Sequence, residues 1–403
     1  MYFLLVYKED YPWDVRVEKI TRTLNDLGYS GGVLARNRSC RVSEECLDGI
    51  LVNRLPKISS VPAFIRFLIN LPLWFNPVWI WSIYSLTKRN SYKVIIVRDL
   101  PLVKAAIVVG KITGTKVIYD MAECYPLMYD SIQSVGSNGI SSRLLKNSHL
   151  AALYEKECVH KVDWVWVMIE ESRDRLINNL GVPPDKVSIV SNTPILREER
   201  DYSGYHNDRK VRIVYVGFLS LLRGLDLLIE GVSAFCELED RSKISVDIIG
   251  KGKEAESLKE LVRQRGVADV VTIHGWLEQD EVDRLVQSSN VGALTYRNCS
   301  HWNHTIPNKL FDYMAAGLPV LAGDIKPIAR IMAECECGLV ADATDKGEIA
   351  RNLIKLSDPA YRNILGENGY QKYRQRYNWD REVSVIQKDL DTLLNGVQVT
   401  ASN

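Results

Sequence analysis

The residues best suited to chemistry stand in the stretch TIPNKLFDYMAAGLPVLAG, residues 305–323. Pro307 and Asn308 form a favourable helix entry, with Asn308 as a candidate N-cap and Asp312 in the first turn. The N–H groups and positive potential of a helix N-terminus suit a phosphate or a sugar hydroxyl. Lys309 and Asp312 stand three residues apart and therefore share one face of that helix. A cation and a carboxylate side by side there can hold a diphosphate and a ribose diol together.

A second candidate is VGFLSLLRGLDLLIEG, residues 216–231. A predicted strand ends at Gly217, and Arg223 stands at the start of an amphipathic helix. The glycine lets the backbone approach a phosphate, and the arginine supplies positive charge. Turns of this kind are common in α/β proteins, so the stretch is not specific by itself.

The elements that must position these residues are predicted strands and helices that alternate regularly along the chain. Short apolar, β-branched runs alternate with amphipathic stretches, which predicts parallel sheets covered on both faces by helices. The expected strands of the first half are Tyr2–Tyr7, Gly32–Ala35, Ile50–Asn53, Val94–Val97, Lys116–Tyr119, Trp164–Met168 and Val187–Val190. Those of the second half are residues 211–217, 244–250, 270–275, 291–296, 319–323 and 338–342.

The alternation of strands and helices is interrupted by the polar stretch 191–209, which we interpret as a linker. We therefore expect an α/β protein with two Rossmann-like domains, 1–195 and 208–375, facing each other across a cleft that holds the active site. Residues 376–403 form a C-terminal helix and tail, and the sequence does not say on which domain this helix packs. Its Asp389-Leu390-Asp391 pair is interpreted as part of a solvated helix face.

Composition narrows the classes of function. The chain has 403 residues with 51 Lys and Arg against 50 Asp and Glu, which argues against binding of nucleic acid by bulk charge. Eight cysteines are too few for a disulfide scaffold, and neither they nor the histidines show the spacing of a metal site. The first apolar run is six residues long without a basic leader, so it suits a strand rather than a signal peptide. These features predict a cytoplasmic protein without a metal.

Residues 61–86 form an apolar, aromatic segment, and residues 67–87 carry no charged side chain. Two prolines interrupt a helix there, and a membrane crossing would place strands of one sheet on opposite sides of the bilayer. We expect a monotopic, peripheral contact with the cytoplasmic face of the membrane, made by Trp74, Trp79 and Trp81 at the interface. The alternative is a helix pair buried inside the first domain.

Taken in order, these motifs resemble retaining glycosyltransferases of family four, also called glycosyl transferases group 1, which have the GT-B architecture. The resemblance covers nearly the whole chain. It is carried by V-G-x-L-x(3)-R-G (216–224), I-I-G-x-G (248–252), H-G-W (274–276) and P-N-K-L-F-D-Y-M-A-A-G-L-P-V (307–320), and in the first half by D-V-R-V-x-K (14–19), Y-D-M-A-E-C-Y-P (119–126), L-Y-E-K-E (153–157) and S-N-T-P (191–194).

The resemblance implies roles for the residues at these motifs. Arg223 and Lys309 would meet the donor diphosphate, and Asp312 would bind the ribose. Asp120 and Glu123 are the candidates from the first domain for contact with the reacting sugar. The remaining donor-side positions are Gly217, Phe218, Trp276, His304 and Asn308, and the acceptor-side positions are Asp14 and Arg16.

The chain departs from the family pattern at three positions. Phe218 stands where the family usually has an arginine, and Lys309 is the expected substitute. His304 occupies the place of the first acid in the E-x(7)-E pair, which changes the charge near the hexose. Ala122 stands where the family often carries a histidine.

The expected function is transfer of a hexosyl group, with retained configuration and without a cofactor, from a nucleotide-diphosphate sugar. We expect UDP rather than GDP as the carrier, and the acceptor would be lipid-linked or another saccharide in the assembly of cell-surface polysaccharide or glycolipid. Two alternatives remain: a nucleotide-sugar epimerase on the same fold, and a catalytically degenerate glycosyltransferase acting as a partner subunit.

Overall fold

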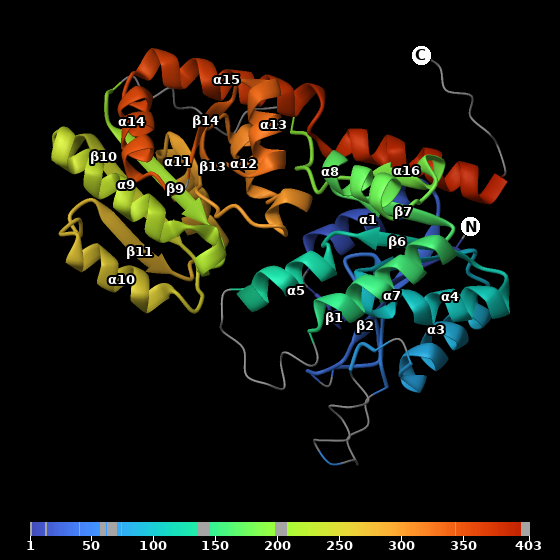
Figure 1. Ribbon diagram of the computed structural model, residues 1–403. Coiled ribbons are helices and arrows are strands. Elements are labelled where there is room, and N and C mark those ends of the chain that lie inside the picture. The colour runs from blue at the N-terminus through green and yellow to red at the C-terminus, as the bar shows by residue number, and fades with distance from the viewer. Residues whose placement is uncertain are drawn as a thin grey trace. The chain divides into compact units, whose positions relative to one another are not determined.

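The computed structural model describes residues 2–12, 14–39, 41–56, 62, 71–73, 75–134, 146–197, 208–342 and 344–395. The chain divides into two compact units (Figure 1). Unit 1 comprises Met1–Asn192 and Glu382–Asn403, and unit 2 comprises Thr193–Arg381. Most of the predicted linker lies outside the described residues.

Unit 1 is built on an eight-stranded sheet in the order β3-β4-β2-β1-β5-β6-β7-β8. All neighbours pair parallel except β3 and β4. The predicted parallel sheet is confirmed, and only the polar, half-exposed edge strand β3 was missed, because it lacks an apolar run. The strands are β1 (Tyr2–Asp10), β2 (Ser30–Arg36), β3 (Glu44–Leu47), β4 (Ile50–Arg54), β5 (Val94–Arg98), β6 (Lys116–Met121), β7 (Trp164–Val167) and β8 (Val187–Ile189).

The helices of unit 1 other than the C-terminal α16 connect successive strands and pack on the sheet through apolar faces. They are α1 (Val15–Asp26), α3 (Pro77–Asn90), α4 (Val103–Thr113), α5 (Tyr125–Ser134), α7 (Ser148–Lys161), α8 (Glu170–Asp174) and α16 (Trp379–Asn395), with short turns at η1 (Leu100–Leu102), Arg175–Asn179 and Pro184–Lys186.

Helix α3 corrects part of the membrane prediction. Trp79 is fully buried, because α3 packs against α4 and places Trp79 and Ile83 in the core. Trp81 lies two residues further, on the opposite side of the helix, and is 65% exposed. Trp74 lies outside the described residues. In the described part of the chain, no helix is both long and apolar enough to span a bilayer.

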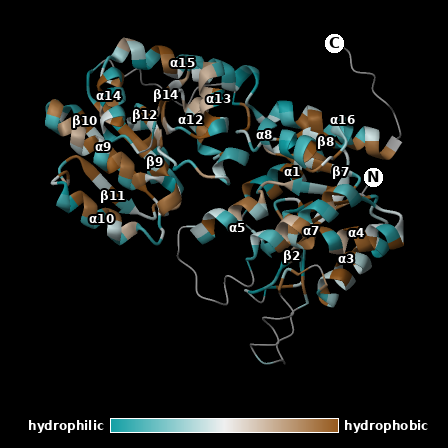
Figure 2. Cartoon of the chain, viewed as in Figure 1, coloured by the Kyte–Doolittle hydropathy of each residue, from teal (hydrophilic) through white to brown (hydrophobic). Residues whose placement is uncertain are grey.

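Unit 2 is built on a six-stranded, all-parallel sheet in the order β11-β10-β9-β12-β13-β14. Each strand coincides with a predicted run: β9 (Val211–Val216), β10 (Ile244–Ile249), β11 (Val271–Gly275), β12 (Val291–Leu294), β13 (Val320–Gly323) and β14 (Gly338–Ala341). The helices are α9 (Leu225–Leu238), α10 (Ala255–Gln264), α11 (Gln279–Ser288), α12 (Lys309–Ala316), α13 (Lys326–Cys335), α14 (Lys346–Leu356) and α15 (Pro359–Gln375). Figure 2 shows hydrophobic and hydrophilic residues mixed along surface helices such as α9 and α10, as expected when one face is buried.

Strand order identifies where each unit can bind a ligand. In unit 1 the chain builds outward from β1 through β2 to β4 and then returns to add β5 on the other side of β1. In unit 2 it builds outward from β9 to β11 and returns to add β12 on the other side of β9. Ligands of open parallel sheets bind at the carboxyl ends of the two strands that flank such a reversal. We call these places the switch point of unit 1, at β1 and β5, and the switch point of unit 2, at β9 and β12.

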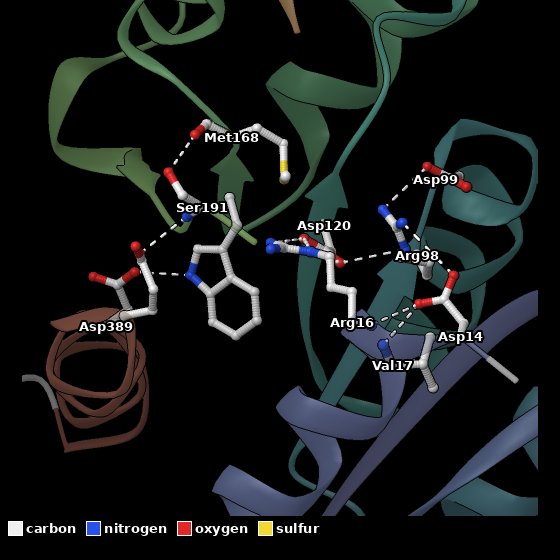
Figure 3. Close-up of polar contacts among 11 residues, drawn as sticks. Asp14, Arg16, Val17, Arg98, Asp99, Asp120, Met168, Ser191 and Asp389 are labelled. Atoms are coloured by element: carbon white, nitrogen blue, oxygen red, sulfur yellow. Dashed lines mark hydrogen bonds and ion pairs between the residues drawn. The ribbon is translucent and has the colours of Figure 1, made fainter. Parts of the chain in front are cut away.

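The C-terminal helix α16 joins unit 1 from Glu382 onward, which the sequence left open. The interpretation of its acidic pair as a solvated face is wrong for Asp389, which is 3% exposed. Its carboxylate accepts a hydrogen bond from Trp166 Nε1 on β7 (2.8 Å), which is drawn in Figure 3. It accepts a second hydrogen bond from Ser188 Oγ on β8 (2.9 Å). A buried carboxylate with two donors therefore ties α16 to the sheet.

This carboxylate predicts a pH dependence of stability. Burial raises the pKa of Asp389 from 3.8 to about 6, although the bonds from Ser188 and Trp166 oppose the shift. The folded state therefore binds the proton of Asp389 more tightly than the unfolded state. Because of this group, the free energy of unfolding should fall by about 1 kcal/mol as pH rises from 5.0 to 7.5.

Urea unfolding of the wild type and of Asp389→Asn at both pH values measures the effect. In Asp389→Asn, the difference in unfolding free energy between pH 5.0 and pH 7.5 should be about 1 kcal/mol smaller than in the wild type. Asp391→Asn, two residues along the same helix and half-exposed, is the matched control and should keep the wild-type slope. An unchanged slope in Asp389→Asn contradicts the assignment.

Candidate functional site

Two loops at the carboxyl edge of the unit 2 sheet pack backbone against backbone. Gly250, at the end of β10, has a φ of 140°, and a Cβ there would lie 1.8 Å from the carbonyl oxygen of Gly217. A Cβ at Gly252 would lie 1.9 Å from the carbonyl oxygen of Leu219. Only glycine permits this approach, which fixes the path of the loop that leads from β9 to Arg223.

Arg223 is the central cation of the unit 2 switch point. It ends the short turn η4 (Leu221–Arg223), and its guanidinium lies 4.6 Å from the ring centres of both Tyr296 and Trp302. Its Nη1 also donates a hydrogen bond to the Tyr296 hydroxyl. No carboxylate of the described residues pairs with it. The positive charge is therefore held in place by aromatic rings and is not neutralised by an acid.

Two neighbours of Arg223 strengthen its preference for an anion. Burial, followed by the charges of Arg223 and His304, lowers the pKa of His301 to about 4, so this imidazole is neutral at pH 7. Trp302 is 7% exposed, and its Nε1 has no hydrogen-bond partner among the described residues. The cluster thus offers one cation and one unused donor.

The predicted pairing on α12 is confirmed: Lys309 Nζ lies 2.9 Å from Asp312 Oδ2, with both side chains about 40% exposed. Asn308 occupies the N-cap position, but its side chain makes no cap bond, which corrects that expectation because its backbone is already helical (φ −54°, ψ −28°). His304 closes a turn in front of α12, and its Nδ1 donates to the carbonyl oxygen of Ser300 (3.0 Å).

Two large aromatic side chains at the ends of unit 2 strands are exposed. Phe218, after β9, is 67% exposed, and Trp276, after β11, is 69% exposed. The ring of Trp276 lies 4.7 Å from Lys251 Nζ. Lys251 was not among the predicted site residues, although it fills the variable position of the I-I-G-x-G motif. An exposed indole beside a cation can stack on a planar base.

In unit 1 the structure gives three of the predicted site residues internal partners. Arg16 Nε donates to both carboxylate oxygens of Asp120 at 3.0 Å, and the two side chains are each 1% exposed (Figure 3). Asp14 caps α1 by accepting from the backbone N–H groups of Arg16 and Val17. Asp120 thus lies in a buried ion pair with Arg16, and its contact with the reacting sugar stays a prediction. Glu123 lies three residues beyond, half-buried.

Three residues at the unit 1 switch point were not among the predicted site residues. Lys8 lies near the end of β1, Arg98 is the last residue of β5, and Asp99 follows it. Asp99 Oδ2 lies 3.5 Å from Lys8 Nζ, and Asp99 Oδ1 lies 3.5 Å from Arg98 Nη1. The available signal was the charged pair Arg98-Asp99 directly after the apolar run of β5.

Residues 197–372 match the family described as glycosyl transferases group 1, and this match covers most of unit 2. The D-inositol 3-phosphate glycosyltransferase of Streptomyces bingchenggensis is 23% identical over 244 residues, which cover 56% of this chain and 52% of that protein. The chain thus spans about half the length of the curated relatives it matches.

Solved structures extend the likeness to both units. The sucrose-phosphate synthase of Thermosynechococcus elongatus has a TM-score of 0.77 at 14% identity, covering 98% of this chain and 100% of that one. Anabaena HepE in complex with UDP has a TM-score of 0.69 at 13% identity, covering 97% and 100%. The predicted GT-B fold, two Rossmann-like α/β domains with a C-terminal helix, is confirmed.

Proposed function

We propose that the protein is a glycosyltransferase that moves a hexosyl group from a nucleotide-diphosphate sugar, with retained configuration, to a hydroxyl of an acceptor. The observation that carries the proposal is Arg223. It is a cation without an acidic partner among the described residues, held by two rings at the switch point of the domain that matches the family. UDP is the favoured carrier, and the complex of Anabaena HepE with UDP supports this choice.

The chemistry needs positive charge where the diphosphate departs. Arg223, Lys309 and the N-terminus of α12 would stabilise the negative charge that grows on the leaving group, each donor contributing about 3 kcal/mol. The departing phosphate can itself accept the proton of the acceptor hydroxyl, so the reaction requires neither a separate base nor a metal. Asp312 would hold the ribose diol beside Lys309, to which it is paired.

Calorimetric titration with UDP and GDP tests the donor side. We expect a micromolar to millimolar dissociation constant for UDP and a weaker one for GDP. Labelled UDP-sugars incubated with the protein and a membrane lipid extract then separate the activities. Sugar on an acceptor supports the transferase, isomerised donor supports the epimerase, and nucleotide binding without either product supports the degenerate subunit. No affinity for any nucleotide would overturn the proposal.

We propose further that the acceptor is lipid-linked and that unit 1 contacts the cytoplasmic face of a membrane through α3. Trp81 is 65% exposed on this helix, and its ring lies 6.0 Å from that of Tyr84. Lys88 in the last turn of α3 supplies positive charge for anionic headgroups, whereas its neighbour Arg89 is paired with Glu44 (2.9 Å). Exposed aromatics beside basic residues suit the interfacial layer of a bilayer.

Replacing Trp81 with Ser should weaken binding to vesicles of phosphatidylcholine and phosphatidylglycerol about tenfold, the size expected when one apolar side chain no longer inserts. Sedimentation of the protein with the vesicles measures this change. Leu238→Ser, an exposed leucine at the end of α9 in unit 2, is the control and should leave sedimentation unchanged. Equal sedimentation of wild type and Trp81→Ser contradicts the membrane contact.

A further inference from the structure

Asp99 holds a backbone conformation that normally belongs to glycine. It is the single residue between β5, which ends at Arg98, and η1, which begins at Leu100. Its φ of 69° and ψ of 161° lie in a region that side chains with a Cβ enter only under strain. Strain of this kind persists where the surrounding structure or the function requires that residue.

Local structure does not account for the choice of aspartate. The Asp99 side chain makes no cap bond to η1. Its backbone N–H donates to the carbonyl oxygen of Asp120 (3.0 Å), which any residue other than proline could do. Its contacts with Lys8 and Arg98, 3.5 Å each, are longer than the 2.7–2.9 Å typical of charge-assisted hydrogen bonds. A glycine would fit the backbone better, so the carboxylate itself needs an explanation.

The N–H groups of Arg98 make only long contacts with the carboxylates around them. Its guanidinium lies among three carboxylates, at 3.5 Å from Asp99, 3.8 Å from Asp14 and 3.9 Å from Asp120 (Figure 3). Its Nε is buried and has no hydrogen-bond partner in the described part of the chain. The side chain is 13% exposed, so water satisfies it only in part. The terminal nitrogens Nη1 and Nη2 have only the long contacts to Asp99 and Asp14, and an oxygen of a bound ligand would complete their bonding.

The unit 1 switch point has no excess of positive charge. Lys8 and Arg98 are matched by Asp14 and Asp99, and the buried Arg16–Asp120 pair is neutral as a unit. Glu9, 3.6 Å from Lys8, is paired with Arg36, and the charge of Glu123 also acts on Arg98. The site therefore gives no net attraction for a phosphate or a carboxylate. A donor and an acceptor side by side instead match a hydroxyl group, which accepts one hydrogen bond and donates another.

We propose that Arg98 and Asp99 form a subsite for a neutral polyol, the hydroxylated part of the acceptor. Arg98 donates to a hydroxyl oxygen, and Asp99 accepts the hydrogen of that hydroxyl or of its neighbour. The position fits, because β1 and β5 flank the strand-order reversal where parallel sheets bind ligands. The subsite rests on the proposed function, since it names the acceptor class of that reaction.

Saturation-transfer NMR with four probes tests the subsite on the full chain. Methyl α-D-glucopyranoside, methyl α-D-mannopyranoside and myo-inositol are the neutral polyols, and glucose 1-phosphate is the anionic comparison. At least one neutral probe should bind the wild type at millimolar concentration, more tightly than glucose 1-phosphate. Asp99→Gly should bind that probe at least fivefold more weakly than the wild type. It should also raise the thermal midpoint of unfolding by about 2–6 °C, because the backbone strain is relieved.

Asp48→Gly is the matched control. Asp48 also has a positive φ (48°) but lies in the exposed turn between β3 and β4, so its variant should bind the polyol like the wild type. These measurements are made with UDP present to occupy the unit 2 switch point. The subsite is overturned if no neutral polyol binds the wild type, if glucose 1-phosphate binds more tightly, or if Asp99→Gly binds the probe unchanged. A lower thermal midpoint in Asp99→Gly would also overturn it, because the carboxylate would then be structural. UDP titration of the same proteins reports separately on the proposed function.

Discussion

Arg223→Ala should weaken UDP binding about 10- to 100-fold, the loss expected when a charged hydrogen bond to phosphate disappears. The effect should be large because the unit 2 switch point offers this guanidinium without an acid to neutralise it. Arg223→Lys keeps the charge but loses the planar guanidinium and its stacking on Tyr296 and Trp302. Its affinity for UDP should therefore lie between those of the wild type and Arg223→Ala. Calorimetric titration with UDP measures all three.

Two controls make this result specific. Arg241→Ala removes another arginine of unit 2, which lies in the turn before β10 and is paired with Asp269. This variant should bind UDP as tightly as the wild type. Asp312→Ala should cost less than Arg223→Ala, because its loss removes the ribose contact while freeing Lys309 for the diphosphate. If Arg223→Ala and Asp312→Ala both bind UDP within twofold of the wild type, the site is elsewhere.

The fold was predictable because parallel strands buried on both faces are continuous apolar runs. Every expected strand is present, and the strand that was missed, β3, is polar and lies at an edge. Local spacing was equally informative, as the contact between Lys309 and Asp312 on one turn of α12 shows. Sequence reasoning was reliable wherever a pattern within about ten residues determines the outcome.

The remaining features depend on partners far apart in the chain. Nothing in the sequence shows that Asp120 pairs with Arg16, 104 positions away, or that Asp389 meets Trp166 across 223 positions. An aromatic segment likewise does not reveal which face of its helix is covered: Trp79 is buried and Trp81 is exposed. A charged residue in a motif is therefore a weak guide to catalysis until its partners are known.

Arg16→Ala should destabilise unit 1 by about 3–5 kcal/mol, the cost of leaving a buried charge without its partner. Asp120 is fully buried, and after the substitution its nearest remaining cation is Arg98, 3.9 Å away. Urea unfolding followed by circular dichroism measures the loss. Arg22→Ala is the matched control, because Arg22 lies on the same helix in an exposed pair with Glu18, and it should cost less than about 1 kcal/mol.

The double variant Arg16→Met with Asp120→Leu separates charge burial from packing. Replacing both partners by apolar side chains of similar volume removes the uncompensated charge, so most of the stability lost in Arg16→Ala should return. Recovery of stability together with unchanged UDP affinity would show that the pair organises the carboxyl edge of unit 1 without touching the nucleotide. If instead Arg16→Ala unfolds like the wild type, Asp120 does not depend on Arg16 for its charge. Its carboxylate would then be available for contact with the reacting sugar, as the sequence predicts.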